Sequence, residues 1–163
     1  MALLNILKEG EETLRKKSRP LDKITERTRT LLDDMLETMR HADGVGLAAP
    51  QVGVLRRIVV IEVEPGEVIE LINPEIIYSS GSQTGLEGCL SIPGKNGICT
   101  RPSYVKVRAL DREGNKREYE GTGLLARCFC HEIDHLDGRL YPDIADRMMT
   151  PEEVAEYYAE DDK

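Results

Sequence analysis

The stretch HEIDHLDG, at residues 131–138, contains two of the three histidines in the 163-residue chain. His131 and His135 are four residues apart, so on an α-helix their imidazoles lie on one face, one turn apart. A helix is expected from about Thr122, with Gly138 ending it. Two histidines at this spacing predict that the helix binds one metal ion.

A glutamate, Glu132, stands directly after the first histidine. On a helix it lies about 100° round the axis from His131, beside a bound ion and not under it. A carboxylate in that place is able to take a proton from water bound to the ion without filling a coordination site. The alternative is a helix with two surface histidines and an incidental glutamate, which requires coincidence in a chain so poor in histidine.

The third metal ligand must come from elsewhere, and the four cysteines are the candidates. Cys128 shares the helix face of the histidines, but three ligands spread over seven residues would span about 10 Å of helix axis, too far for a short side chain. Cys130 is rotated off that face. Cys89 and Cys99 both remain open, because spacing alone does not choose between them.

Composition and charge describe an ordinary globular protein. Apolar residues make up 40% of the chain and charged residues 32%, while the net charge is −8 and the pI is about 5.0. This charge argues against a protein whose main task is to grip phosphate backbones, although it leaves a local basic patch open. The sequence shows neither an export signal nor a membrane span, so we expect one cytoplasmic domain over residues 1–163. In that compartment the four cysteines are expected to be free thiols or metal ligands and not disulfides.

Strand patterns fill the middle of the chain, and helical patterns flank them. Helices are expected at 25–43, where Thr25 is the N-cap and Gly44 ends the helix, and after the capping box TPEE at 150–153. Residues 44–53 and 81–102 are rich in glycine, serine and proline and are interpreted as loops. The predicted strands are 56–63, 68–74, 75–80, 104–111 and 116–121. This order indicates an α+β fold instead of alternating βαβ units.

Three motifs, GVGLAAPQ (44–51), EGCLS (87–91) and HEIDH (131–135), occur in that order in a chain of this size. Together they resemble the peptide deformylase family of bacteria, and the resemblance spans nearly the whole chain. It implies mixed, mainly antiparallel strands packed around a central metal-binding HExxH helix. It also implies a hydrolase of protein biosynthesis that removes the formyl group from N-terminal formyl-methionine of newly made proteins and releases formate.

The resemblance implies a cofactor and partners as well. The cofactor is one divalent ion, Fe²⁺ in the cell, whose ligands also accept Zn²⁺, Ni²⁺ or Co²⁺. The partners are formyl-methionyl nascent peptides met close to the ribosome, by a monomer without specific nucleic-acid binding. The acidic segment 150–163 has the wrong sign for docking to RNA.

Specific residues follow from matching these motifs. The implied metal ligands are Cys89, His131 and His135, and the acid–base residue is Glu132. The side-chain amide of Gln51 and the backbone N–H of Leu90 are implied to flank the reacting carbonyl, where they donate hydrogen bonds to the oxyanion.

The remaining implied residues surround the substrate. Gly44 and Gly46 form a wall of the peptide groove, where glycine permits unusual backbone angles and close approach of a peptide. Arg127 is expected near the mouth of the pocket, and Glu87 is expected to hold either the 44–46 loop or its own. The pocket for the first side chain is implied to be lined by Val45, Leu124 and Cys128, for which core packing is the alternative.

Two other functions compete with this hypothesis. An endopeptidase of the zincin type shares the HExxH pattern, but such sites take a third His or Glu downstream, and no histidine follows His135. A structural zinc module is closed by four protein ligands and needs no glutamate between the histidines.

Overall fold

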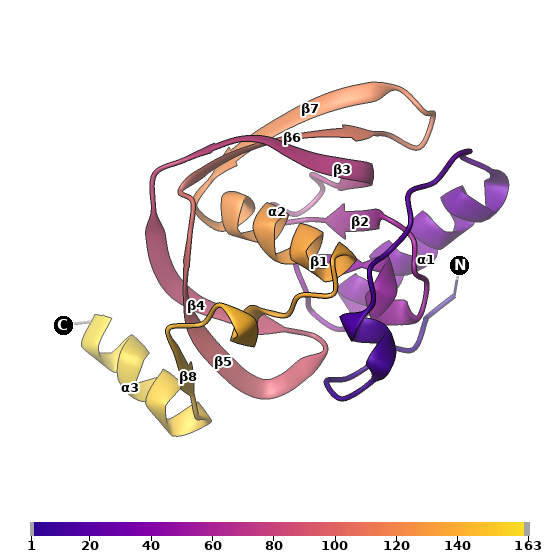
Figure 1. The fold of residues 1–163 in the computed structure, drawn as a ribbon. Helices are drawn as coiled ribbons and strands as arrows, with labels where there is room; N and C mark the ends of the chain where they lie inside the picture. The colour runs from indigo at the N-terminus through magenta and orange to yellow at the C-terminus, as the bar shows by residue number, and fades with distance from the viewer. Residues whose placement is uncertain (1, 162–163) are drawn as a thin grey trace.

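The structure is a computed structural model, and it describes residues 2–161 (Figure 1). In chain order the elements are η1 (Glu12–Arg15), α1 (Glu26–His41), β1 (Gly46–Ala48), η2 (Ala49–Val52), β2 (Ile58–Ile61), β3 (Ile69–Ser80), β4 (Gln83–Cys89), β5 (Ile92–Arg101), β6 (Tyr104–Leu110), β7 (Lys116–Thr122), α2 (Gly123–Leu136), η3 (Tyr141–Asp143), β8 (Arg147–Met149) and α3 (Pro151–Asp161).

The strands form two sheets, and neighbouring strands within each sheet are antiparallel. The larger sheet has the order β1-β2-β3-β6-β7, and the smaller has the order β4-β5-β8. Helix α2 packs against β1, β6 and β7 of the larger sheet and against β5 of the smaller one (Figure 1). The predicted combination of mainly antiparallel strands with a few helices is therefore confirmed.

The larger sheet is buried on both faces where β2 crosses it. Val59 and Ile61 pack with Phe129 of α2, whereas Ile58 and Val60 pack with the apolar face of α1. All four β2 residues are at most 1% exposed, which explains why this strand is continuously apolar in sequence. Each such side chain contributes about 1.5–3 kcal/mol through burial, so β2 and its two helices form the core that supports β1 and α2.

Two segments interpreted as loops contain strands. Residues 81–102 form the antiparallel hairpin β4–β5, and residues 44–53 contain β1 and the short helix η2. The hairpin was missed because its buried positions include polar and glycine residues, which hide the alternating pattern. The two strands predicted at 68–74 and 75–80 are one strand, β3, with an irregular register between Ile72 and Glu75.

The helix ends agree with the sequence except at one residue. Helix α1 begins after Thr25, whose N–H donates to Thr28 Oγ1 over 3.1 Å, as expected for an N-cap region. At its other end the helix stops at His41, and the residue in the left-handed conformation is Asp43, with φ of 58°, and not Gly44, which was expected to end the helix. The predicted capping box of α3 is present, because Glu153 N–H donates to Thr150 Oγ1 over 3.2 Å.

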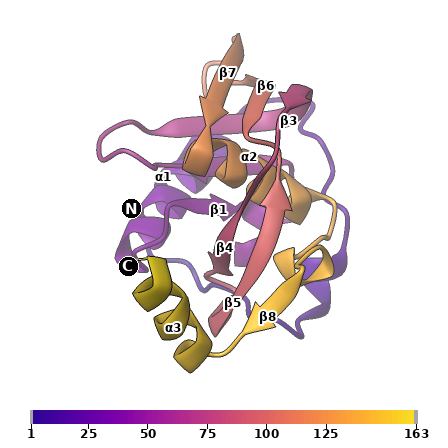
Figure 2. The same ribbon diagram turned by 90° about the vertical axis from the view of Figure 1, so that its left-hand side faces the viewer.

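Helix α3 packs on β5 and β8, at the edge of the smaller sheet (Figure 2). Among the described residues 2–161, no helix combines the length and the apolar content that crossing a bilayer requires.

Candidate metal centre and active site

A pocket of about 420 Å³ opens between β1, the β4–β5 hairpin and α2. Strands β1 and β4 are both at the edge of their sheets, so each has backbone groups free to face the pocket. All the predicted site residues except His135 line it. These are Gly44, Val45, Gly46, Gln51, Glu87, Cys89, Leu90, Leu124, Arg127, Cys128, His131 and Glu132.

The three predicted ligands converge from two elements. The candidate ligand atoms of Cys89, His131 and His135 all lie within 4.8 Å of one another. The Cys89 Sγ is 3.4 Å from the His135 Nε2. Cys89 is at the end of β4, directly after a register irregularity between Glu87 and Cys89 in the pairing of β4 with β5. Tertiary structure thus brings Cys89, and not Cys99, to the histidine pair.

The other three cysteines are buried thiols. Burial raises the pKa of Cys99 and Cys130 to about 11 and that of Cys128 to about 12. A protonated thiol is a poor metal ligand. Cys128 lines the pocket, whereas Cys99 is fully buried under η3.

The two histidines have opposite surroundings on their ring Nδ1 atoms. His131 Nδ1 lies 2.8 Å from Glu87 Oε1, and because an ionised carboxylate only accepts, the His131 N–H donates. The ring of His131 also stacks on Tyr141, with centroids 6.0 Å apart. His135 Nδ1 is buried without a partner in the described part of the chain. Burial lowers the pKa of His135, followed by repulsion from His131 and Arg101, so its imidazole is neutral and has a lone pair to offer.

Glu132 is buried beside this trio with an incomplete set of partners. It is 4% exposed, and its Oε1 accepts no hydrogen bond from the residues described. Burial raises the pKa of Glu132 to about 7. Its Oε2 would lie only 2.5 Å from a Cβ placed on Gly46. Gly46 is therefore required for close approach and not for backbone angles, because neither it nor Gly44 has a positive φ.

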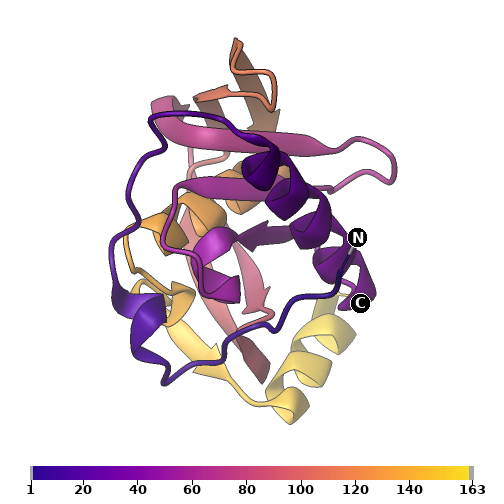
Figure 3. The ribbon, with the colours of Figure 1, turned by 90° about the vertical axis from the view of Figure 1, so that its right-hand side faces the viewer.

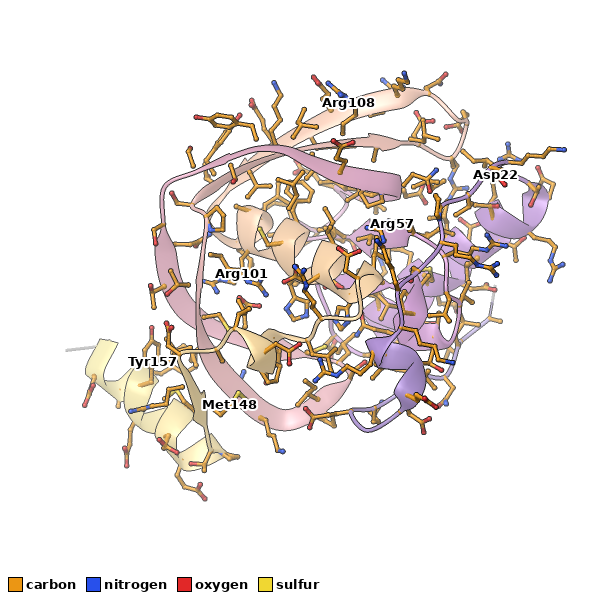
Figure 4. The ribbon with its side chains drawn as sticks, in the orientation of Figure 1. Asp22, Arg57, Arg101, Arg108, Met148 and Tyr157 are labelled. Carbon is orange, nitrogen blue, oxygen red and sulfur yellow. The ribbon has the colours of Figure 1, made fainter. Side chains whose placement is uncertain are left out.

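Glu87 occupies the other side of His131 and is fully paired. Its carboxylate accepts from Arg101 Nε at 2.9 Å and Nη2 at 3.0 Å, and from Arg127 Nη1 at 2.6 Å. Burial alone would raise the pKa of Glu87, but the hydrogen bonds from His131 and Arg101 hold it well below its usual value. Arg101 also binds Asp134 Oδ2 at 2.7 Å, which joins β5 to α2 (Figure 4).

These contacts decide one alternative that the sequence left open, for Glu87, and change one expectation, for Arg127. Glu87 holds its own hairpin, through Arg101 of β5, and not the 44–46 loop. Arg127 does not stand at the mouth of the pocket. It is 7% exposed, with its guanidinium on Glu87 and on the Cys99 carbonyl. The sequence contained a signal for this, because Arg127 lies among apolar residues of its helix and a buried arginine needs an acidic partner.

Gln51 is oriented by the short helix η2. Its Oε1 accepts from the Ala48 N–H at 3.0 Å, so its amide NH₂ must point the other way. That NH₂ lies 3.5 Å from Cys89 Sγ and 3.1 Å from Ser91 Oγ. The side-chain amide therefore presents a donor directly beside the candidate ligand trio.

Sequence reasoning missed several neighbours of the site. Arg101, Ser91 and Tyr141 contact its members, and Pro93–Asn96 line the pocket. All but Tyr141 come from the segment interpreted as a loop. Their signal would have been the register of the β4–β5 hairpin, which was not recognised.

A thiol, two imidazoles and a buried carboxylate gathered at one pocket are the parts of a metallohydrolase. The chain matches the family model of polypeptide deformylase over residues 3–150. It belongs to this family, and its activity is the removal of the N-formyl group from nascent peptides. The endopeptidase and the structural zinc module are thereby set aside.

Individual relatives agree along most of the chain. The peptide deformylase of Lachnoclostridium phytofermentans is 62% identical over 143 residues, which cover 86% of this chain and 88% of that protein. The peptide deformylase of Alkaliphilus metalliredigens is 60% identical, over 88% of this chain and 97% of that protein. A crystal structure of a peptide deformylase from Legionella pneumophila superposes with a TM-score of 0.86 at 40% identity, covering 99% of each chain.

Proposed function

We propose that the pocket between β1 and β4 is where this deformylase hydrolyses the formamide of formyl-methionyl peptides, with one divalent ion held by Cys89, His131 and His135. The observation that supports this most strongly is the convergence of those three side chains within 4.8 Å. A buried carboxylate, Glu132, stands directly beside them.

The donor set fits a divalent transition metal. One thiol sulfur and two imidazole nitrogens suit Zn²⁺, Fe²⁺, Co²⁺ or Ni²⁺ better than they suit Mg²⁺ or Ca²⁺. The hydrogen bond from His131 Nδ1 to Glu87 leaves Nε2 as the free nitrogen of that ring. When bound, the ion supplies Lewis acidity, which polarises the formyl carbonyl and lowers the pKa of water.

Glu132 is proposed as the acid–base residue. Its pKa of about 7 is suited both to accepting a proton and to returning it near neutral pH. We infer that the carboxylate takes a proton from the attacking water and delivers it to the nitrogen of the leaving amine. Burial keeps bulk water from competing for that proton.

Gln51 and Leu90 are proposed to stabilise the oxyanion that forms on the formyl carbonyl. The hydrogen bond from Ala48 N–H to Gln51 Oε1 supports this role, since it holds the NH₂ group facing the trio before substrate arrives. Leu90 follows Cys89 directly and lines the same pocket, where its backbone N–H is the second donor.

The peptide is proposed to lie between the edge strands β1 and β4. Unpaired backbone groups on both edges support the addition of an extended chain, which would place alternate side chains in pockets. The first side chain, methionine, would then meet Val45, Leu124 and Cys128, of which Val45 and Leu124 are 39% and 51% exposed. Solvent-accessible apolar side chains at a pocket support binding of a flexible apolar group.

The formyl group is proposed to be selected by lack of space. Because Glu132 Oε2 already approaches Gly46 so closely, the wall offers little room for the extra methyl of an acetyl group. Overpacking a rigid site costs about 1–3 kcal/mol, so acetylated peptides should react slowly.

Several wider features belong to the same proposal. We infer one deformylase domain over residues 1–163, supported by the family match over 3–150 and by α2 joining both sheets. We also infer that it acts in the cytoplasm, as a monomer, on chains still near the ribosome, with iron as the ion in the cell.

Formate release from formyl-Met-Ala, acetyl-Met-Ala and formyl-Gly-Ala peptides tests the site, with an internal peptide as the endopeptidase control. The formyl-Met peptide should react fastest by a wide margin. Comparable kcat/KM on the acetylated or internal substrate would overturn the proposal. Metal analysis of anaerobically purified protein tests the ion, with Cys89→Ala expected to lose it and Cys99→Ala expected to keep it.

A further inference from the structure

Basic residues concentrate in one short segment of this acidic protein. Residues 15–29 contain seven Lys or Arg and only two acidic residues, although the whole chain has a net charge of −8. The segment runs along one side of the molecule, from η1 up to the beginning of α1 (Figure 3). We use the name basic strip for the exposed Lys and Arg residues that follow Arg15 in this segment, together with one neighbour from another segment, namely Lys16, Lys17, Arg19, Lys23, Arg27 and Arg56.

Tertiary contacts bring Arg56 into this strip. Arg19 and Arg56 form an isolated bridge between parallel backbones, and the Arg57 N–H donates to the Arg19 carbonyl over 3.0 Å. Lys23, Arg27 and Arg56 line one groove of about 640 Å³, together with a single acidic residue, Asp22. Two segments far apart in sequence therefore build one positively charged surface.

The cations of the strip are not neutralised by acidic residues in the part of the chain that the structure describes. Other arginines of the same region are paired, as Arg15 is with Asp143 and Arg29 is with Glu26. Across residues 2–161, by contrast, no ion pair within 4.0 Å involves any of the six strip residues. Their charge is available to another molecule.

We propose that the basic strip binds the phosphate backbone of folded RNA, without reading its sequence. A run of lysines and arginines along a surface is the footprint of phosphate contacts. An acidic protein partner fits less well, because protein interfaces are anchored by buried aromatic residues, and the groove at the strip is lined by none.

The net negative charge of the protein does not oppose this binding strongly. Exposed charges separated by more than about 8 Å are largely screened at physiological salt, so RNA responds to the local field. The acidic helix α3 lies at the lower left of Figure 1, whereas the strip runs along the right-hand side. The basic strip is therefore a local basic patch of the kind that the negative net charge of the whole chain did not exclude.

Binding at the strip leaves the catalytic pocket accessible, because none of the six residues lines that pocket. A deformylase held on RNA in this way could take up peptides that emerge close to ribosomal RNA. The strip itself does not depend on the assignment of the metal site, so each proposal can fail without the other.

The test measures fluorescence anisotropy of a labelled RNA hairpin of about 20 base pairs between about 50 and about 200 mM salt. The strip variant combines Lys17→Gln, Lys23→Gln and Arg27→Gln. The matched control combines Lys8→Gln, Lys106→Gln and Lys116→Gln, which make the same change in net charge on residues outside the strip and the pocket. Thermal melting and formate release from a short formyl peptide should be the same in all three proteins.

We expect the strip variant to bind RNA at least tenfold more weakly, with the slope of log Kd against log salt reduced by roughly 2–3 for three lost phosphate contacts. The control variant should stay within about twofold of the parent. The proposal is overturned if the parent does not bind at the lowest salt, or if both variants lose equal affinity. It is also overturned if a polyglutamate peptide binds the strip as tightly as the RNA, which would indicate an acidic protein partner.

Discussion

The two sides of the catalytic pocket hold a buried carboxylate in different ways. On the β4 side, Glu87 accepts hydrogen bonds from Arg101, Arg127 and His131, and its pKa lies well below the usual value. On the α2 side, Glu132 is about equally buried, but one of its oxygens has no partner among residues 2–161, and its pKa is raised to about 7.

The difference teaches how one residue type serves two purposes in one site. A carboxylate surrounded by cationic donors stays ionised and holds its neighbours in place. A carboxylate that is buried without such donors is easily protonated near neutral pH, as proton transfer requires. Glu87 should therefore matter mainly for folding and metal-site order, and Glu132 mainly for turnover.

The largest expected effect separates the α2 side from the rest. Glu132→Gln should lower kcat about a thousand-fold, because an amide neither accepts nor returns a proton. Metal content should be unchanged. The melting temperature should not fall, because the substitution removes a poorly paired buried carboxyl. A wild-type kcat in Glu132→Gln would contradict the role of Glu132 in proton transfer, and with it the contrast to Glu87.

The next effect concerns the β4 side. Glu87→Gln leaves Arg101 and Arg127 buried without a full counter-charge, which should cost about 3–5 kcal/mol in the free energy of unfolding. Denaturant unfolding measures this. The control is Glu118→Gln on the surface, where loss of the pair with Arg108 should cost about 0–1 kcal/mol. Equal losses of unfolding free energy in Glu87→Gln and Glu118→Gln would mean that burial does not make the pairs of Glu87 more important for stability than the surface pair.

Acid should remove the contribution of Glu87. Its folded pKa is lowered, so its stabilising effect is complete above the unfolded value of 4.5 and declines as the pH falls below that value. The stability gap between the parent and Glu87→Gln should therefore narrow below about pH 4.5. Unfolding curves at a series of pH values check this, and a gap that widened in acid would contradict it.

A smaller effect is expected at Gln51, whose side-chain amide lies beside the three candidate metal ligands. Gln51→Leu should lower kcat by about a hundred-fold, because the proposed oxyanion donor is lost while the side-chain volume is nearly kept. Steady-state kinetics on a formyl-Met peptide measure it, with KM expected to change little. A rise in KM alone would mean that Gln51 binds substrate and does not stabilise the transition state.

The smallest effect tests how tightly Glu132 is packed. A Cβ at Gly46 would press on Glu132 Oε2 at 2.5 Å, whereas one at Gly44 would meet the flexible end of Leu90 at 2.6 Å. Gly46→Ala should raise the activation free energy by about 1–3 kcal/mol. Gly44→Ala is the matched control and should lose less. Similar kcat/KM values in the two variants would show that Glu132 is free to move aside.

Most of the helices and one hairpin could be predicted from the sequence, because their signals are local. The pattern around His131 and His135 lies within one turn of α2, and the capping box of α3 spans four residues. The β6–β7 hairpin is predicted by alternating apolar and polar residues on both sides of a short turn. Hydrogen bonds and periodicity of this kind join residues that are close in the chain.

Only the tertiary structure decided how the site is assembled. The hydrogen bond between Glu87 and His131 joins residues 44 positions apart, and the choice of Cys89 over Cys99 depends on the register of a hairpin whose polar interior gave no strand pattern. The inward orientation of the Arg127 side chain has the same cause, because its partner Glu87 is within reach only when β4 lies close to α2. Such contacts follow from strand register and helix packing, which no short window of sequence specifies.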